Sequence, residues 1–318
     1  MKKIIVILLA LLLVGCSKTN EISSDDISDL SIAVPSGAPS ICFYDEINND
    51  EFATGDAQSI LPELKGENGS DIIVIDTVNG IKALNAGANY KLAATITFGN
   101  FYIATTGIDD NGVMDEGDYI VLFSKGATPD LIFHYVFGDK FDSNIHYVSA
   151  VSDASACLIK GINITDDERD INEQPYVDYV MIAEPALSVA MSQSEYASVY
   201  INMQDRYKQK NEHRMVQASV FVSNKLSDEQ INAYLSKLEN SINVLLSNPS
   251  VFDDATKDLA DAEIKEIFGV PNGRIVSKVL KNNTIGIGFR RAYENKEDID
   301  NYISIFGMEK TNEEIYFK

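Results

Sequence analysis

A three-part unit recurs along this chain: an apolar, β-branched run, then a turn of small residues, then a helical pattern. The first two copies are "LSIAVPSGAPSICFYDEI" (30–47) and "DIIVIDTVNGIKALNAG" (71–87). After an acidic, turn-rich run (109–118), the unit returns in segments 118–138, 144–161 and 176–191. Strands that alternate with helices in this way predict an α/β fold with mostly parallel sheets flanked by helices.

The restart of the unit after the acidic run predicts two sheets and therefore two lobes. We expect the chain to cross to the second lobe near Gly107 and to return near Met215. Lobe 1 would then comprise residues 30–107 plus 215–318, and lobe 2 residues 108–214. A chain of this length can bury two cores of ordinary size.

The first residues, "MKKIIVILLALLLVGCSK", combine a basic start, a short apolar run and small residues before Cys16. This pattern resembles a bacterial lipoprotein signal, whose cysteine becomes the lipidated first residue. The alternative is a transmembrane helix, but the apolar run is shorter than the roughly 20 residues that span a bilayer. We therefore predict a signal peptide (1–15) and a polar, flexible tether (16–29) that is anchored by acyl chains on Cys16 to the extracytoplasmic face of the membrane.

The charge of the chain excludes some classes of partner. The 48 acidic and 26 basic residues give a net charge of -22, which repels nucleic acid, and no basic stripe is present. The cysteines that follow Cys16 are Cys42 and Cys157, and their apolar settings predict two buried free thiols. No cofactor is expected, because the sequence has no P-loop and no dinucleotide-binding glycine motif in a strand–turn–helix setting.

A metal site is not expected either. In "DDNGVMDEGD" (109–118), Gly112 comes too early for an EF-hand loop, and the flanking helices are missing, so a surface turn is the better interpretation. The three histidines, His134, His146 and His213, are scattered without the spacing of a zinc site.

The order of these motifs carries a resemblance to a known family. A lipoprotein signal precedes "VPSGAPS", "DIIVID" with "NGIKALNAGANYKLAA", "KGATPDLIFHYVFG", "VSDASACLIKGINI" and "VDYVMIAEPALSVAM". Together they resemble the type 2 periplasmic solute-binding proteins of ABC importers, closest to the nitrate, sulfonate and thiamine-precursor branch, from about Ser31 to Gly307. The chain departs from this pattern in "MDEGDYIVL", which lacks the usual lysines, and in having no tryptophan.

The resemblance implies two lobes that close on a small solute, delivery of the solute to a membrane permease with its ATPase, a monomer, and no catalysis. An enzyme on the same fold, of the pyrimidine-forming or menaquinone-pathway type, is the main alternative. A surface lipoprotein that has lost its pocket is the other. The export signal favours the solute receptor over the cytoplasmic enzymes.

Small and polar residues follow several predicted strands, where ligands of open α/β sheets bind. Ser36, Gly37, Ala38 and Ser40 form the first such turn, and the family position also places them at the ligand. We expect a bulky replacement of Ser36 or Ser40 to abolish binding without unfolding the protein. The further candidates at strand ends are Thr77, Thr97, Asn100, Gly126, Ala127, Thr128, Asp153 and Glu184.

Each candidate also has a structural interpretation, because Ser, Thr and Asp cap helices and Gly permits turns. Thr128 is predicted as a helix N-cap, with Pro129 at the first helical position. Glu184 either faces the cleft, where it would favour an amine or a ring N–H donor, or caps the next helix, which we favour. The aromatic residues available for stacking on a ligand are Phe43, Tyr44, Phe98 and Phe101.

Overall fold

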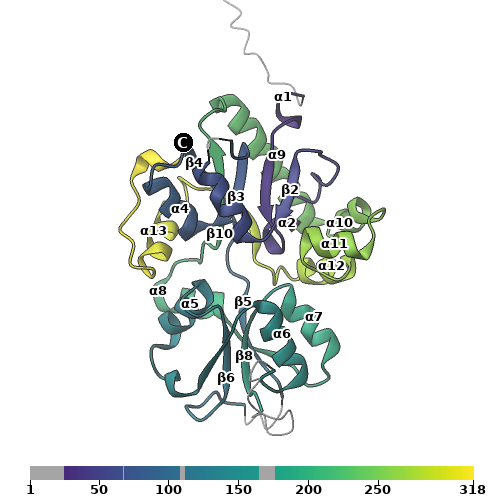
Figure 1. The fold of residues 1–318 in the computed structure, drawn as a ribbon, viewed down its shortest axis with the longest axis vertical. Coiled ribbons are helices and arrows are strands. Elements are labelled where there is room, and N and C mark those ends of the chain that lie inside the picture. The colour runs from purple at the N-terminus through teal and green to yellow at the C-terminus, as the bar shows by residue number, and fades with distance from the viewer. Residues whose placement is uncertain (1–24, 67, 108–111, 165–175) are drawn as a thin grey trace, which may run out of the picture.

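The computed structural model describes residues 25–66, 68–107, 112–164 and 176–318, which form two lobes, each built on one sheet (Figure 1). The first sheet has six strands in the order β11 (Ile287–Arg291), β4 (Tyr90–Thr97), β10 (Ala218–Ser223), β3 (Ile72–Asp76), β1 (Ile32–Pro35) and β2 (Phe52–Gly55). The second sheet has five in the order β7 (Ile145–Val148), β6 (Ile120–Phe123), β8 (Tyr179–Ala183), β5 (Phe101–Thr105) and β9 (Ser198–Asn202). The predicted signal peptide, Cys16 and most of the tether lie outside the described residues.

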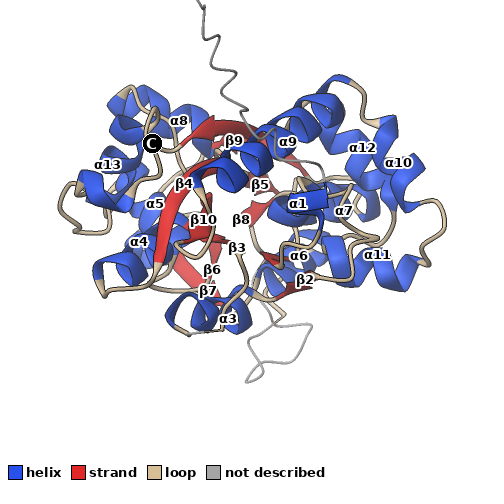
Figure 2. Ribbon diagram, turned by 90° about the horizontal axis from the view of Figure 1, so that it is seen from above, coloured by secondary structure: helices blue, strands red, loops and turns tan. Residues whose placement is uncertain are grey.

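Helices cover both sides of the strands (Figure 2). Those of the first lobe are α1 (Asp25–Ser28), α2 (Ala38–Ile41), α3 (Ala57–Ile60), α4 (Thr77–Asn85), α9 (Asp228–Ser247), α10 (Ser250–Thr256), α11 (Asp261–Phe268), α12 (Gly273–Lys281) and α13 (Lys296–Ser304), with 3-10 turns η1 (Leu61–Lys65) and η3 (Glu313–Ile315). Those of the second lobe are α5 (Thr128–Phe137), α6 (Val151–Lys160), α7 (Ala186–Gln193) and α8 (Met203–Asn211), with the 3-10 turn η2 (Asp142–Asn144). Among the described residues, no helix is both long enough and apolar enough to cross a bilayer.

The two-lobed α/β class is confirmed, but the sheets are mixed rather than mostly parallel. Strands β1, β2 and β3 pair in parallel, as do β6, β7 and β8. Strands β5 and β10 run antiparallel to both of their neighbours, as β11 does to β4. Each of β5 and β10 follows a crossing from the other lobe, so it enters its sheet at the edge where the parallel strands end and must run the opposite way.

The first crossing lies earlier than we expected. The prediction near Gly107 put residues 101–105 in lobe 1, whereas β5 pairs with β8 and β9 in the second sheet. The chain therefore crosses between β4 and β5 at residues 98–100, where Gly99 has a positive φ of 110°. The second crossing leads from α8 to β10 and includes Met215, near which we expected it.

Several local predictions agree with the structure. Strand β3 is an unbroken apolar run and is buried on both faces, as expected for an inner strand of an α/β sheet. Helix α9 begins with the predicted capping box: the N–H of Gln230 donates to Ser227 Oγ (3.2 Å), and the N–H of Ser227 donates to Gln230 Oε1 (3.1 Å). Cys42 and Cys157 are both free and buried, and burial raises the pKa of each thiol.

Candidate functional site

The turn after β1 is closed largely by its own polar groups. The N–H of Ser36 donates to Gly55 O (2.9 Å), and the N–H of Gly37 donates to Ser40 Oγ (3.1 Å). The Ser40 hydroxyl donates back to Gly37 O (3.0 Å), and its side chain is fully buried. Ser36 Oγ donates to Glu266 O at the end of α11 (2.7 Å). Both hydroxyls therefore hold the turn together, and a bulky residue at position 40 would disrupt the fold as well as any site.

Two backbone N–H groups of the same turn have no hydrogen-bond partner among the described residues. Among the described residues, the N–H groups of Ala38 and Ser40 make no hydrogen bond. Ala38 is only 4% exposed. Buried backbone N–H groups without a partner are rare in proteins.

Two glycines mark open space at the strand ends. Gly37, after β1, has φ +114°, and Gly126, after β6, has φ +76°. A Cβ built at either position would have no atom within 4 Å. The positive φ explains why glycine occupies both positions. The N–H of Gly126 donates to Asp130 Oδ2 (2.7 Å), and that of Ala127 to Ser124 O (2.9 Å), so these two amides are engaged within their own turn.

The two lobes touch at these strand ends. Thr128 Oγ1 of lobe 2 donates to Asp76 Oδ2 of lobe 1 (3.3 Å), while Asp76 Oδ1 caps α4 by accepting from the N–H of Asn79 (3.0 Å). Burial raises the pKa of Asp76. The helix N-cap of α5 is Ala127 rather than the predicted Thr128, which is the first helical residue. Thr128 therefore has its hydroxyl free of the capping role, and it reaches across to the other lobe.

Three candidates from lobe 1 and the first crossing serve the fold. Thr77 is fully buried, with its Oγ1 2.7 Å from Ser219 Oγ, and Thr97 is 2% exposed. Asn100 Nδ2 donates to Glu184 O (2.8 Å), and Asn100 Oδ1 accepts from Gln217 Nε2 (2.8 Å). Since Asn100 lies at the first crossing and Gln217 at the second, this pair joins the two crossings.

The acidic candidates of lobe 2 both cap helices. Asp153 Oδ2 accepts from the N–H of Ala150 (3.1 Å) at the start of α6. Glu184, 4% exposed, accepts from the Ser188 N–H (3.0 Å) and Ser188 Oγ (2.8 Å) of α7. It also accepts from Thr284 Oγ1 of lobe 1 (3.2 Å). Desolvation raises the pKa of Glu184. Its carboxylate is thus taken up by three donors, which agrees with the capping interpretation.

The four aromatic candidates are buried rather than presented to a cleft. Phe43, Tyr44, Phe98 and Phe101 are at most 8% exposed. Phe43 stacks on Phe52 with ring centroids 6.2 Å apart. Sequence periodicity does not separate a core aromatic from one that stacks on a ligand.

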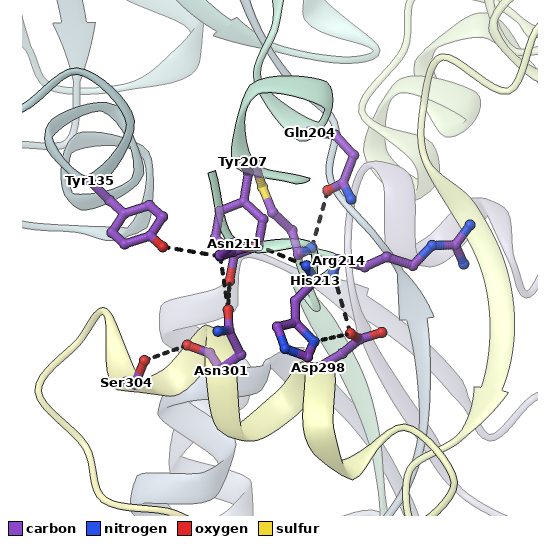
Figure 3. Close-up of polar contacts among 10 residues, drawn as sticks. Tyr135, Gln204, Tyr207, Asn211, His213, Arg214, Asp298, Asn301 and Ser304 are labelled. Atoms are coloured by element: carbon purple, nitrogen blue, oxygen red, sulfur yellow. Dashed lines mark hydrogen bonds and ion pairs between the residues drawn. The ribbon is translucent and has the colours of Figure 1, made fainter. Parts of the chain in front are cut away.

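A polar network at the second crossing joins the lobes, and no local sequence pattern predicts it (Figure 3). Tyr207 OH and Asn211 Nδ2 from α8 both donate to Asn301 Oδ1 on α13 (2.8 Å each). His213 Nδ1 lies 2.9 Å from Asp298 Oδ1, also on α13. Helix α8 packs against α5 and β5 of lobe 2, whereas α13 packs against α4 of lobe 1. The network therefore fastens lobe 2 to lobe 1 beside the crossing.

The residues that could hold a metal are dispersed. No group of three or more His, Cys, Asp or Glu side chains in the described part of the chain is arranged to hold a metal ion. The acidic run 109–118 lies partly outside the described residues.

No protein-family model matches this sequence, and no curated protein matches it significantly. Solved structures, in contrast, do match this chain. An ABC transporter from Parabacteroides distasonis is 17% identical with a TM-score of 0.69, covering 92% of this chain and 99% of that chain. The periplasmic aliphatic sulphonate binding protein SsuA from Escherichia coli is 15% identical with a TM-score of 0.60, covering 91% of each chain. The alkanesulfonate-binding protein SsuA from Xanthomonas axonopodis pv. citri, bound to MOPS, is 11% identical with a TM-score of 0.56, covering 88% and 92%. At these identities the similarity shows a shared fold, that of two-lobed type 2 periplasmic binding proteins.

Proposed function

We propose that this protein is a lipid-anchored, extracytoplasmic solute receptor of an ABC importer. It would capture a small organic or anionic solute between its lobes, as a monomer, and deliver the solute to a membrane permease and its ATPase. The observation that carries the proposal is the pair of facing strand ends: the Asp76–Thr128 contact joins the lobes there, and Gly37 and Gly126 border open space beside it. The relatives in fold described as an ABC transporter and as sulphonate-binding proteins support the same function.

The pairing of β1 with β3 and the contact of Thr128 with Asp76 support one location for the solute. Strands β1 and β3 are parallel neighbours, so the turn after β1 lies about 5 Å, one strand spacing, from the end of β3. Thr128 contacts the end of β3, which brings residues 126–128 of lobe 2 to the same edge. We therefore place the solute between the turn at 36–40 and the turn at 126–128. The unpaired N–H groups of Ala38 and Ser40 favour an acceptor such as a sulfonate, nitrate or other anionic group.

The engaged carboxylate of Glu184 argues against a cationic solute. A buried carboxylate that already accepts three hydrogen bonds has little capacity left for an amine or ring N–H donor. Thiamine precursors, which the sequence also suggested, would then have to be recognised through their other polar groups.

Ligand screening by thermal unfolding tests the solute site. A panel of sulfonates, nitrate, thiamine precursors and amines is added to the wild-type protein, and a solute at 100 times its Kd should stabilise the folded state by about 2.7 kcal/mol. Mass spectrometry of the released solute should show it chemically unchanged, whereas an enzyme would return a product.

The matched variants are Gly126→Asn and Gly307→Asn. Asparagine tolerates the left-handed conformation of both glycines, and both positions have open space around the added side chain. Gly126→Asn places its side chain beside the proposed solute and should abolish the ligand-induced shift, while Gly307→Asn at the end of α13 should leave it intact. An undiminished response in Gly126→Asn would refute the site.

The lipid anchor has a separate test. When Cys16→Ser is expressed in a bacterial host that is fed a labelled fatty acid, the variant should carry no label and should leave the membrane fraction. Label that persists in Cys16→Ser would contradict the proposed anchor without bearing on solute binding.

A further inference from the structure

A cavity lies between the lobes at the two crossings, and of the ligand-binding candidates named from the sequence only the aromatic candidate Phe98 lines it. Its volume is about 410 Å³. Both crossings, the start of α8 and strand β11 contribute to its wall, which includes Phe98, Tyr102, Asn202, Gln204, Arg214 and Arg290. We call this space the hinge cavity.

The charge of the hinge cavity is opposite to that of the protein as a whole. Its lining contains Arg214 and Arg290 and no carboxylate, in a chain with 48 acidic and 26 basic residues. Within the described ranges, neither guanidinium forms an ion pair. Two arginines in one cavity would repel each other, and an anion between them would relieve that repulsion.

The orientation of Arg214 fits this role. Its side chain extends away from the nearby His213–Asp298 pair rather than joining it (Figure 3). The guanidinium instead lies over the Phe98 ring, 5.6 Å from the ring centroid. A guanidinium with free N–H donors recognises carboxylate, sulfonate and phosphate groups in a bidentate manner.

Further donors and apolar surface complete the site. Gln204 Oε1 accepts from the N–H of Met215 (3.2 Å), which leaves the Gln204 amide NH2 to donate. Asn202 Oδ1 likewise accepts from the N–H of Gln204 (2.9 Å), which leaves its own NH2 group. Phe98 and Phe289 add aromatic faces to the lining. Donors beside aromatic rings suit a ligand that has an acidic group and a flat apolar body.

We propose that the hinge cavity binds a small aromatic organic anion, held by Arg214 and Arg290. The site is independent of the solute cleft. Since both crossings line it, an occupant would contact the segments that must rotate when the lobes move, and so would change the affinity for the solute. This last consequence rests on the proposed solute-receptor function, whereas the binding of the anion does not.

The proposal is tested in the full mature chain by calorimetric titration with two anions, benzoate and phenylphosphonate. Benzamide, the neutral match of benzoate, is the control. Both anions should bind, benzamide should not, and the affinity should fall as NaCl is raised, because both arginines are solvent-exposed. Arg214→Gln and Arg290→Gln should each weaken binding about tenfold or more. Arg274→Gln, which removes an exposed charge from α12, should leave it unchanged.

Removal of a nearby negative charge should have the opposite effect and strengthen the binding of an anion. Burial is the main cause of the raised pKa of the lining residue Tyr102, and the charges of the buried Glu184 and of Asp205, exposed on the first turn of α8, add to it. Asp205→Asn should therefore strengthen binding of benzoate. The variants are exposed substitutions whose folding is checked by thermal unfolding.

Three results would overturn the proposal. They are the absence of anion binding to the wild type at millimolar concentration, equal binding of benzamide and benzoate, and undiminished binding in both arginine variants. Binding that is lost in Gly126→Asn but kept in the arginine variants would assign the anion to the solute cleft and would also refute the hinge site. If no solute stabilises the protein in thermal unfolding but benzoate binding still depends on the two arginines, the solute-receptor function is wrong and the hinge site stands.

Discussion

The environment of Glu184 predicts how the stability of the protein changes with pH and with substitution of this residue. Its carboxylate is 4% exposed and accepts from the Ser188 N–H, from Ser188 Oγ and from Thr284 Oγ1. Replacement by Gln keeps the volume of the side chain. One amide oxygen can serve the Ser188 N–H, and either hydroxyl can rotate to accept from the amide NH2. Replacement by Ala instead leaves the Ser188 N–H and Ser188 Oγ without this acceptor, while Thr284 Oγ1 keeps only its 3.4 Å contact with Val279 O.

The pH dependence follows from the raised pKa. At a pH well below the ordinary pKa of a glutamate, Glu184 is protonated in both the folded and unfolded states, so its burial carries no charge penalty. As the pH rises, the unfolded state ionises first and the folded state ionises later, so this group's contribution to the free energy of unfolding falls until the pH exceeds the folded pKa. Glu184→Gln has no such group, and its stability should lack this decline.

The assay is urea unfolding of both proteins from pH 4 to pH 8. Dilute protein is needed at the acidic end, because the sequence pI is about 4.4 and solubility is lowest there. The free energy of unfolding of the wild type minus that of Glu184→Gln should be greatest at the acidic end and should fall towards neutral pH. Glu184→Ala should lose about 2 kcal/mol or more at every pH, because the two buried donors of Ser188 lose their acceptor. A difference curve that is flat, or that rises with pH, would show that desolvation does not dominate at Glu184.

Two further variants follow from single contacts. Thr284→Val removes the hydroxyl that lobe 1 donates to Glu184, and it should cost about 1 kcal/mol in urea unfolding. The loss should be smaller when the substitution is made in Glu184→Ala, where the hydroxyl keeps only its 3.4 Å contact with Val279 O, so full additivity would contradict the contact with Glu184. Gly80→Ala places a Cβ 2.0 Å from Phe221 Cζ in the core and should destabilise the protein by about 1–3 kcal/mol in thermal unfolding. The control Gly117→Ala, at an exposed position with open space, should be nearly neutral, and equal effects of the two variants would contradict the packing of Gly80 against Phe221.

Much of the fold can be predicted from local patterns, because these patterns have local physical causes. The continuous apolar run of β3 and the Ser227–Gln230 capping box each specify an element through contacts within a few residues. The first crossing could not be placed from such patterns. Residues 90–107 form one β-rich stretch in the sequence, and only the strand partners show that its two halves belong to different sheets. The Gly99–Asn100 interruption was the available signal.

The candidate site was predicted less well than the fold, because sequence places residues at strand ends but does not show which way their polar atoms point. Ser40, Asp153 and Glu184 lie where expected, yet each uses its side chain to bind its own turn or helix. The contacts that join the lobes depend on pairs far apart in sequence, such as Asn100 with Gln217 and Asn211 with Asn301. No local pattern marks either pair.

The distribution of the inter-lobe contacts bears on how the lobes can move. Away from the crossings, Thr128 donates to Asp76 at 3.3 Å, and Thr284 donates to Glu184 at 3.2 Å and accepts from Tyr102 OH at 2.6 Å. At the crossings they are denser, with the pair of Asn100 and Gln217 and the network between α8 and α13.

Opening the cleft therefore requires the loss of a few hydrogen bonds, each with a net value of about 1 kcal/mol, while the contacts at the crossings can persist. We expect the open and closed arrangements to differ by only a few kcal/mol, a gap that a solute of ordinary affinity can reverse. Replacing Thr128 with Val should shift this balance towards the open arrangement and should weaken solute binding without reducing the stability of either lobe. A spectroscopic distance between labels on exposed residues of the two lobes, at positions 125 and 266, should then lengthen in the absence of solute, and an unchanged distance would show that the contact with Asp76 does not hold the cleft closed.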